Sequence, residues 1–246
     1  MPDKFWPKNL RQRLHRLSGE PCLICLESAV TACGVCRHCL DILPWQPPGC
    51  IRCAVIVPDS TSAAPLCNRC AEESPAFDSC HAVFSYESPI DSQIRQFKDL
   101  QGFRAARSLG ELLAISFKSH YRINSLQPPD LLVPVPLHTD RLRRRGFNQA
   151  KLLADAVHKF TRIPVLMEGC TRMQTNLAQR KLNAQGRLAN IGHLFTINSN
   201  TKLTMGRRIA IIDDVITTTA TARDIADIFR QAGCEHIEVW ALARRN

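Results

Sequence analysis

The chain has 246 residues, of which 45% are hydrophobic, 22% charged and 6% aromatic. This composition is typical of a globular protein and excludes a disordered or fibrous chain. The best apolar stretch, 109–117, is interrupted by Gly110 and Glu111 and is much shorter than the roughly 18 residues that a membrane-spanning helix needs. We therefore expect no integral membrane segment. Basic side chains exceed acidic ones by 32 to 22, and the formal net charge of +10 favours polyanionic partners.

Charge and cysteine are distributed unequally along the chain, in opposite ways. Residues 1–85 carry eight basic and eight acidic side chains, so the whole excess of +10 lies in residues 86–246. Ten of the twelve cysteines, in contrast, lie between Cys22 and Cys80. The two asymmetries predict a boundary near residue 80. The predicted units are an N-terminal segment (1–19), a cysteine-rich module (20–79) and a larger domain (80–246).

The N-terminal segment has the pattern of a short basic amphipathic helix. Leu10, Leu14 and Leu17 fall on one helical face, and lysine and arginine side chains occupy the rest. Such a helix either caps the module that follows or lies on a membrane or on DNA. The segment has no apolar core and no small-residue cleavage site, so we do not expect a secretory signal.

The cysteine-rich module contains four CxxC pairs. They are Cys22 and Cys25, Cys36 and Cys39, Cys50 and Cys53, and Cys67 and Cys70. Each pair places two thiolates about one tetrahedral edge apart, and two pairs close a four-cysteine zinc site. Disulfides would need an oxidising compartment, and a redox-active CxxC normally occurs once, beside a βαβ unit. We therefore predict two structural zinc ions, one for the first two pairs and one for the last two.

Cys33 offers an alternative partner for Cys36, since these two residues also form a CxxC spacing. The equal ten-residue gaps on either side of the Cys36–Cys39 pair favour that pair and leave Cys33 free. A four-thiolate zinc site carries a local charge of about −2. With both sites filled the module would be acidic, which favours a structural or docking role over nucleic-acid binding.

Beyond residue 80 the periodicity becomes that of an α/β domain. The pattern predicts strands at 80–86, 131–135, 163–167, 207–212 and 236–243, and helices at 89–100, 103–121, 148–160 and 220–232. Strands that alternate with helices indicate a mainly parallel sheet with flanking helices. Ligands of such a sheet bind at the carboxyl ends of its strands.

One strand end carries a group of polar residues. Asp213 and Asp214 follow an apolar strand, and a hydroxyl-rich loop, 217–221, then leads into a helix. Adjacent carboxylates suit a ribose diol or a divalent metal, while free N–H groups and threonine hydroxyls at a helix N-terminus suit a phosphate. The pattern predicts a site for a phosphorylated sugar, although two solvated acids before a hydroxyl-rich helix cap would give the same spacing.

The chain resembles the ComF/GntX family, in which a double zinc ribbon precedes a type I phosphoribosyltransferase-like domain. The Asp-Asp-Val-x-Thr-Thr run resembles the phosphoribosyl pyrophosphate (PRPP) signature of that superfamily. Further marks of the family are Phe97-Lys98, Val133 to Leu137, Arg145-Gly146-Phe147-Asn148-Gln149, and a run through Arg172, Thr175, Gln179, Leu182, Arg187, Asn190 and Phe195. The resemblance covers about residues 20–244.

The resemblance implies roles for individual residues. Asp213 and Asp214 would bind the ribose hydroxyls, directly or through magnesium, and are the implied catalytic residues. Lys98 and Arg145 would meet the pyrophosphate. The loop Thr217, Thr218, Thr219, Ala220 and Thr221 would hold the 5′-phosphate. A segment with Gln179, Arg187 and Asn190 would close over the ligand or form an ordinary polar helix.

One loop residue departs from the family pattern, because Thr219 stands where the family has glycine. Glycine allows a positive φ or a close approach of the backbone to a phosphate. We therefore expect either a changed loop path or a strained threonine, and in both cases an effect on PRPP binding.

The resemblance implies a role in natural competence, with single-stranded DNA as a partner alongside PRPP or another ribose 5-phosphate ligand. The basic run with Arg141, Arg143 and Arg144, followed by Phe147, suits phosphate contacts and base stacking, although a solvated basic face would have the same composition. Two other functions compete with DNA handling: an active magnesium-dependent phosphoribosyltransferase, and a zinc-ribbon adaptor with a vestigial transferase domain. We expect a cytoplasmic protein that works with competence DNA-translocation proteins at the inner face of the membrane.

Overall fold

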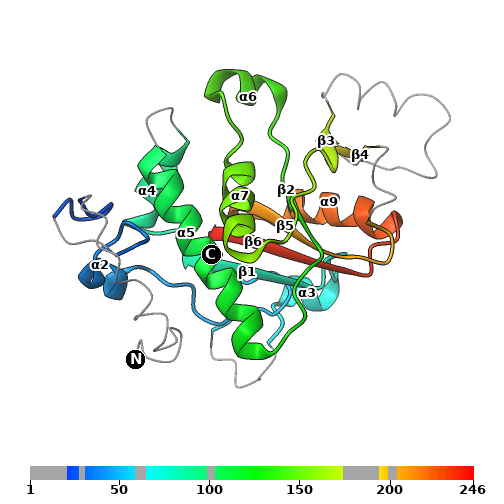
Figure 1. Ribbon diagram of the computed structural model, residues 1–246. Coiled ribbons are helices and arrows are strands. Elements are labelled where there is room, and N and C mark those ends of the chain that lie inside the picture. The colour runs from blue at the N-terminus through cyan, green and yellow to red at the C-terminus, as the bar shows by residue number, and fades with distance from the viewer. Residues whose placement is uncertain (1–20, 28–30, 59–64, 99–102, 174–193, 199–203) are drawn as a thin grey trace.

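A computed structural model describes residues 21–27, 31–58, 65–98, 103–173, 194–198 and 204–246. The predicted fold class is confirmed, since a parallel sheet lies between flanking helices (Figure 1). In the described residues this sheet has the strand order β1-β6-β5-β2, and each neighbouring pair is parallel. The strands are β1 (Ser79–Ser85), β2 (Leu131–Pro134), β5 (Arg208–Ile216) and β6 (His236–Arg244).

Helices cover both faces of the sheet. α5 (Phe103–Asn124) and α7 (Gln149–Thr161) pack on one face, and α9 (Ala220–Gln231) packs on the other (Figure 1). The shorter helices are α2 (Arg37–Ile42), α3 (Asn68–Glu72), α4 (Ile90–Phe97) and α6 (Thr139–Arg145). The strands β3 (Cys170–Arg172) and β4 (Phe195–Ile197) form a small two-stranded antiparallel sheet.

Strand β5 shows why the sheet needs helices on both sides. Its apolar side chains alternate between the two cores: Ala210 and Ile212 pack toward α5 and α7, while Ile209 and Ile211 pack toward α9. All four residues are fully buried. Burial of each isoleucine side chain contributes about 1.5–3 kcal/mol, so both helical layers stabilise the same strand.

The cysteine-rich module packs directly on the α/β domain. Its first part shares a core with α5, and Gly34 lies so close that a Cβ there would be 2.4 Å from Ser108 Oγ. Gly34 also has a φ of 71°, so both the close contact and the left-handed backbone favour glycine at this position. The second part is joined to the sheet by Gln46, which donates to the Ala54 carbonyl and accepts from Ser85 Oγ. The boundary near residue 80 stays a prediction.

The predicted strand at 163–167 is wrong in its extent. The segment forms only an isolated bridge between Val165 and Leu132, through hydrogen bonds that use the Pro164 carbonyl and the Leu166 amide. Pro164 has no N–H to extend the ladder, and the chain turns at Met167–Gly169. The other strands and helices predicted beyond residue 80 are present with shifted ends. The helices α2, α3 and α6 and the β3–β4 sheet were not predicted.

Two predictions lie outside the described residues: the amphipathic helix within 1–19 and the closing segment with Gln179, Arg187 and Asn190. Within the described ranges, the structure contains no helix whose length and hydropathy would let it span a bilayer.

Candidate functional site

The eight CxxC cysteines form two clusters, in the pairing expected from the sequence. Cys22, Cys25, Cys36 and Cys39 form one, and Cys50, Cys53, Cys67 and Cys70 form the other, with all sulfur atoms of a cluster within 4.8 Å of one another. A tetrahedral zinc site with Zn–S bonds of about 2.3 Å separates its sulfurs by about 3.8 Å. The Cys25–Cys36 distance of 3.8 Å and the Cys53–Cys67 distance of 3.6 Å fit that geometry. Both clusters could hold zinc.

The local backbone prepares one thiol of each cluster to become a thiolate. Burial raises the pKa of Cys22, but N–H groups of Cys36, Cys25 and Ile24 outweigh it, and the pKa falls to about 7. The pKa of Cys50 falls to about 7 for the same reason. Cys33 differs, because it lies outside both clusters and burial raises the pKa of its thiol. The donor set therefore fits a thiolate-bound metal and leaves Cys33 free.

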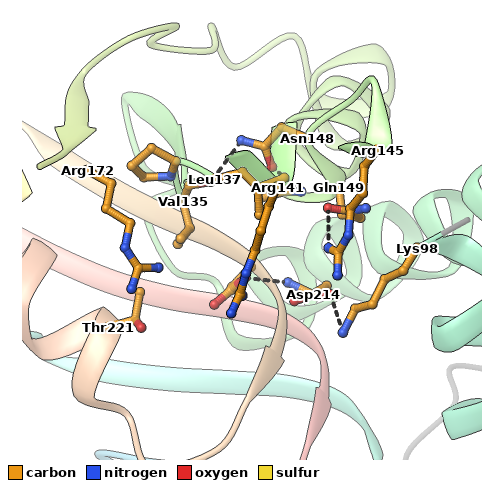
Figure 2. A pocket seen from close by; sticks show the side chains of 13 residues that line it. Lys98, Val135, Leu137, Arg141, Arg145, Asn148, Gln149, Arg172, Asp214 and Thr221 are labelled. Atoms are coloured by element: carbon orange, nitrogen blue, oxygen red, sulfur yellow. Dashed lines mark hydrogen bonds and ion pairs between the residues drawn. The ribbon is translucent and has the colours of Figure 1, made fainter. Parts of the chain in front are cut away.

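A pocket of about 170 Å³ lies at the carboxyl ends of β2 and β5, where ligands of parallel sheets bind (Figure 2). Four regions distant in sequence supply its side chains: the end of α4, the region from Val135 to Ala150, strand β3, and strand β5 with the start of α9. Asp213 and Asp214 lie within β5, not after it as the sequence predicted, because the strand continues to Ile216. Of the sequence-predicted ligand residues, Lys98, Arg145, Asp213, Asp214 and Thr221 line the pocket together.

Asp213 and Asp214 form the acidic side of this pocket. Burial and the neighbouring Asp214 carboxylate raise the pKa of Asp213 well above its usual value, although the Asp214 N–H and Lys98 oppose the shift. The Asp214 N–H donates to Asp213 Oδ1 at 2.8 Å, and Lys98 Nζ lies 3.0 Å from Asp214 Oδ2. A cation that approached the pair would favour the ionised form of Asp213. The pair is therefore suited to a divalent metal or to hydroxyl donors.

Basic side chains surround the acidic pair. Arg141 and Arg145 extend into the pocket from α6, and Arg172 reaches it from β3 (Figure 2). Figure 2 shows the Arg172 guanidinium directed toward Thr221. With Lys98, four cationic side chains meet two carboxylates, and this surplus of positive charge favours a ligand with several anionic groups. Arg172 was known from the sequence only as a family mark, and its place in the pocket was not predicted.

Gln149 is a further pocket residue that sequence reasoning missed. It is 3% exposed, and its amide oxygen accepts from Arg145 Nη1 at 3.2 Å. Its amide nitrogen is buried and has no hydrogen-bond partner among the described residues. A buried donor without a partner costs about 1–3 kcal/mol, which a ligand oxygen could recover. The last position of the Arg-Gly-Phe-Asn-Gln motif thus indicates a ligand contact.

The threonine loop between β5 and α9 carries a left-handed threonine. Thr219 has φ 64° and ψ 0° and is 5% exposed. The positive φ that glycine would adopt freely is therefore kept by a β-branched residue, at a cost of about 1–2 kcal/mol. The Arg223 amide donates to the Thr219 carbonyl at 2.8 Å, which begins α9. Of the loop residues, Thr217, Thr218 and Ala220 are exposed, and only Thr221 lines the pocket.

The residues predicted to contact DNA have different surroundings. Arg143 and Arg144 lie exposed on α6, whereas Arg141 of the same helix lines the pocket. Phe147 is partly buried against the core, with its ring 6.4 Å from that of Phe97. That packing leaves only part of the ring for a base, and its stacking role stays a prediction.

Comparison with known proteins gives the family. Competence protein F of Haemophilus influenzae is 34% identical over 178 residues, which is 72% of this chain and 78% of that protein. The chain belongs to the ComF family. The DNA utilization protein YhgH of Escherichia coli K12 is 30% identical to this chain over 224 residues, which is 91% of this chain and 96% of YhgH. Competence protein ComFC of Streptococcus pneumoniae is 23% identical to this chain over 163 residues, which is 66% of this chain and 67% of ComFC. No family model matches.

Solved structures show more distant likenesses. The glutamine PRPP amidotransferase of B. subtilis has a TM-score of 0.38 and 18% identity, over 61% of this chain and 30% of that one. The purine phosphoribosyltransferase of Pyrococcus horikoshii has a TM-score of 0.35 and 14% identity, over 55% of this chain and 73% of that one. This chain thus spans less than a third of the length of the amidotransferase.

Proposed function

We propose that this ComF-family chain binds PRPP, or another ribose 5-phosphate ligand, with magnesium, and handles single-stranded DNA during natural transformation. The observation that carries the proposal is the pocket at the carboxyl ends of β2 and β5. It combines an acidic pair with four cationic side chains beside the threonine loop. Asp213 and Asp214 would hold magnesium and the ribose hydroxyls, and Lys98, Arg145 and Arg172 would neutralise phosphate groups.

Magnesium, when bound, would supply positive charge between the carboxylates and the pyrophosphate. The protein side chains orient one another and supply the remaining contacts to the ligand. Lys98 holds Asp214 in place at 3.0 Å, and Arg145 keeps Gln149 oriented so that its free amide nitrogen remains available as a donor. Thr221 contributes a hydroxyl at the start of α9, where the helix dipole favours a phosphate.

The DNA part of the proposal is supported by two observations. Relatives of this chain are named Competence protein F and DNA utilization protein YhgH. In the structure, the exposed arginines of α6 lie next to the pocket, so that a strand held by phosphate contacts would pass close to the bound ribose ligand. We further propose a cytoplasmic place of action, at the inner face of the membrane, with DNA-translocation proteins as partners.

A second candidate function is phosphoribosyl transfer itself. The acidic pair favours it, because a surface that only contacts DNA phosphates has no use for two adjacent carboxylates. Release of pyrophosphate from PRPP in the presence of an acceptor would support transfer. If PRPP and DNA both fail to bind while a protein partner is retained only by the zinc-loaded chain, the zinc-ribbon adaptor would remain.

Isothermal titration calorimetry with PRPP and magnesium tests the pocket assignment. The wild-type chain should bind one equivalent, and the Asp213→Asn/Asp214→Asn double variant should bind none while it retains its zinc. The matched control is Asp140→Asn, which removes an acid whose side chain is 70% exposed on α6. Equal binding by the double variant and the wild type would contradict the assignment.

A further inference from the structure

We propose that Arg244 and Arg69 are positioning residues that hold the loop Thr217–Thr219 from the side of the second cysteine cluster. Through them, anion binding in the pocket depends on metal in the cluster of Cys50, Cys53, Cys67 and Cys70. The inference rests on the proposed function, because it concerns how the same loop meets a phosphate. Its experiment includes a readout that needs no ligand.

Arg244 connects the second cluster to the loop at the end of the central strands. Its side chain is buried with 6% of the residue exposed, at the carboxyl end of β6. Nε donates to the Cys53 carbonyl at 2.9 Å. Nη1 donates to the Ile216 carbonyl at 3.2 Å and also to the Thr217 carbonyl. One buried guanidinium thus joins a cysteine of the cluster to the first carbonyls of the loop.

Arg69 makes a second connection, from α3. It lies between Cys67 and Cys70, and its Nη1 donates to the Thr218 carbonyl at 3.0 Å. The start of α9 is joined to the end of α3 as well, since Arg223 Nη2 donates to the Glu73 carbonyl at 3.0 Å. Three arginines therefore bind consecutive parts of the β5–loop–α9 segment to residues in or beside the second cluster.

These contacts fix which way the loop amides point. The carbonyl of one residue and the N–H of the next belong to the same planar trans peptide and point in opposite directions. When Arg244 holds the Thr217 carbonyl, the Thr218 N–H points away from it, and Arg69 orients the Thr219 N–H in the same way. Neither amide has an acceptor in the described part of the chain. Successive N–H groups without an acceptor, next to the left-handed Thr219, are suited to bind an anion beside the pocket.

Metal in the second cluster would fix the Cys53 carbonyl and the backbone of Arg69, because both lie in CxxC pairs of that cluster. Cys53 supplies the carbonyl that Arg244 contacts, and Arg69 lies within the Cys67–Cys70 pair. Metal sites of this type couple metal binding to local folding, so loss of the ion would free both the Cys53 carbonyl and Arg69 to move. The first cluster provides an internal control, since in the described residues no hydrogen bond joins it to the loop.

Hydrogen exchange of the full-length chain without ligand is the first test. Peptides that cover residues 213–221 should exchange at least about ten-fold faster in Arg244→Met and in Arg69→Ala than in the wild type, because each substitution removes charged hydrogen bonds. Arg69 is exposed, so its variant remains informative if Arg244→Met fails to fold. The matched control is Arg122→Ala, an exposed arginine of α5. Unchanged exchange of the loop in Arg69→Ala would overturn the proposal.

Zinc transfer to a chelator is the second test, and it uses PRPP with magnesium as the probe. Coupling between two sites is reciprocal, so a ligand in the pocket must slow zinc release from the cluster that supports the loop. We expect PRPP to slow the release of one of two zinc equivalents in the wild type and of neither in Arg69→Ala. Equal protection in both proteins would contradict the proposal. If PRPP fails to bind the wild-type chain at all, the proposed function fails, while the exchange experiment still decides whether the arginines hold the loop.

Discussion

Lys98 Nζ lies 3.0 Å from Asp214 Oδ2, so the lysine proposed to contact pyrophosphate is paired with an acid proposed to contact ribose. Both side chains are partly shielded from solvent, at 28% and 17% exposure. The pair lowers the cost of placing two carboxylates side by side, because the Lys98 charge lowers the pKa of Asp213 against burial and Asp214. Lys98 therefore stabilises the two adjacent carboxylates, and the proposed function gives it a second role as a phosphate contact.

Replacement of Lys98 by methionine should weaken PRPP binding by about ten-fold or more, because a charged contact is lost. It should also raise the pKa of Asp213 further, so that the loss of binding at low pH begins at a higher pH than in the wild type. Calorimetry across a pH series measures both effects. Lys118→Met is the control, since Lys118 is an exposed lysine of α5. A pH profile identical to that of the wild type would contradict the coupling.

Asp213→Asn should abolish ligand binding yet stabilise the protein at neutral pH when no ligand is added. The folded state raises the pKa of Asp213, so protonation favours folding. The stability that this group contributes is present below its unfolded pKa of about 3.9 and is lost as the pH rises through the higher folded value. Asparagine has no charge to desolvate and avoids that loss. Thermal unfolding at pH 7 should show a higher Tm for Asp213→Asn and an unchanged Tm for Asp140→Asn; a lower Tm for Asp213→Asn would contradict this assignment.

Thr219→Gly should stabilise the protein by about 1 kcal/mol, because glycine adopts a φ of 64° without the strain of a β-branched residue. The gain is partly offset by loss of the 3.3 Å contact from Arg223 Nε to Thr219 Oγ1. Thr218→Gly is the control, since Thr218 has no positive φ and glycine there should only destabilise, by about 0.4–1 kcal/mol. Urea unfolding of the two variants gives the comparison. Equal destabilisation by both would mean that the loop is adapted to its threonine.

Metal analysis should return two zinc ions per chain. Cys33→Ser should retain both, because Cys33 lies outside the clusters and instead lies 2.9 Å from Thr31 Oγ1. Cys39→Ser should lose one, because a four-cysteine site would then have three ligands. One equivalent or none in the wild type would contradict the two-zinc prediction, and loss of zinc from Cys33→Ser would contradict the cysteine pairing.

Sequence patterns located the elements with strong local signals. The part of β5 before Asp213 is a continuous apolar run that is buried on both faces. Asn148 is the N-cap of α7, and its side chain accepts from the Ala150 N–H. The helix α6 was missed because none of its residues is buried, so it has no apolar periodicity. The β3–β4 sheet was missed because each strand has only three residues.

The candidate site was only partly predictable for a related reason. Asp213 and Thr221 belong to one local motif, whereas Arg172 and Gln149 reach the pocket from separate elements that only the fold brings together. The contacts of Arg244 could not be predicted, because they end on backbone carbonyls, which every residue carries. Sequence patterns therefore predicted several residues that line the pocket, but not the contacts that support them.

The salt dependence of DNA binding tests whether this chain handles single-stranded DNA beside the proposed ribose-phosphate site. Fluorescence anisotropy of a labelled single strand should show tight binding at about 50 mM salt that weakens steeply as salt rises. The double variant Arg143→Ser/Arg144→Ser removes two exposed arginines that do not line the pocket, so PRPP binding should persist. The slope of log affinity against log salt should become shallower by about 1.4, because each lost phosphate contact contributes about 0.7. Arg122→Ser/Lys159→Ser, at exposed positions of α5 and α7, should leave the slope unchanged. No salt-dependent affinity of the wild-type chain at about 50 mM salt would contradict the claim and place phosphoribosyl transfer first.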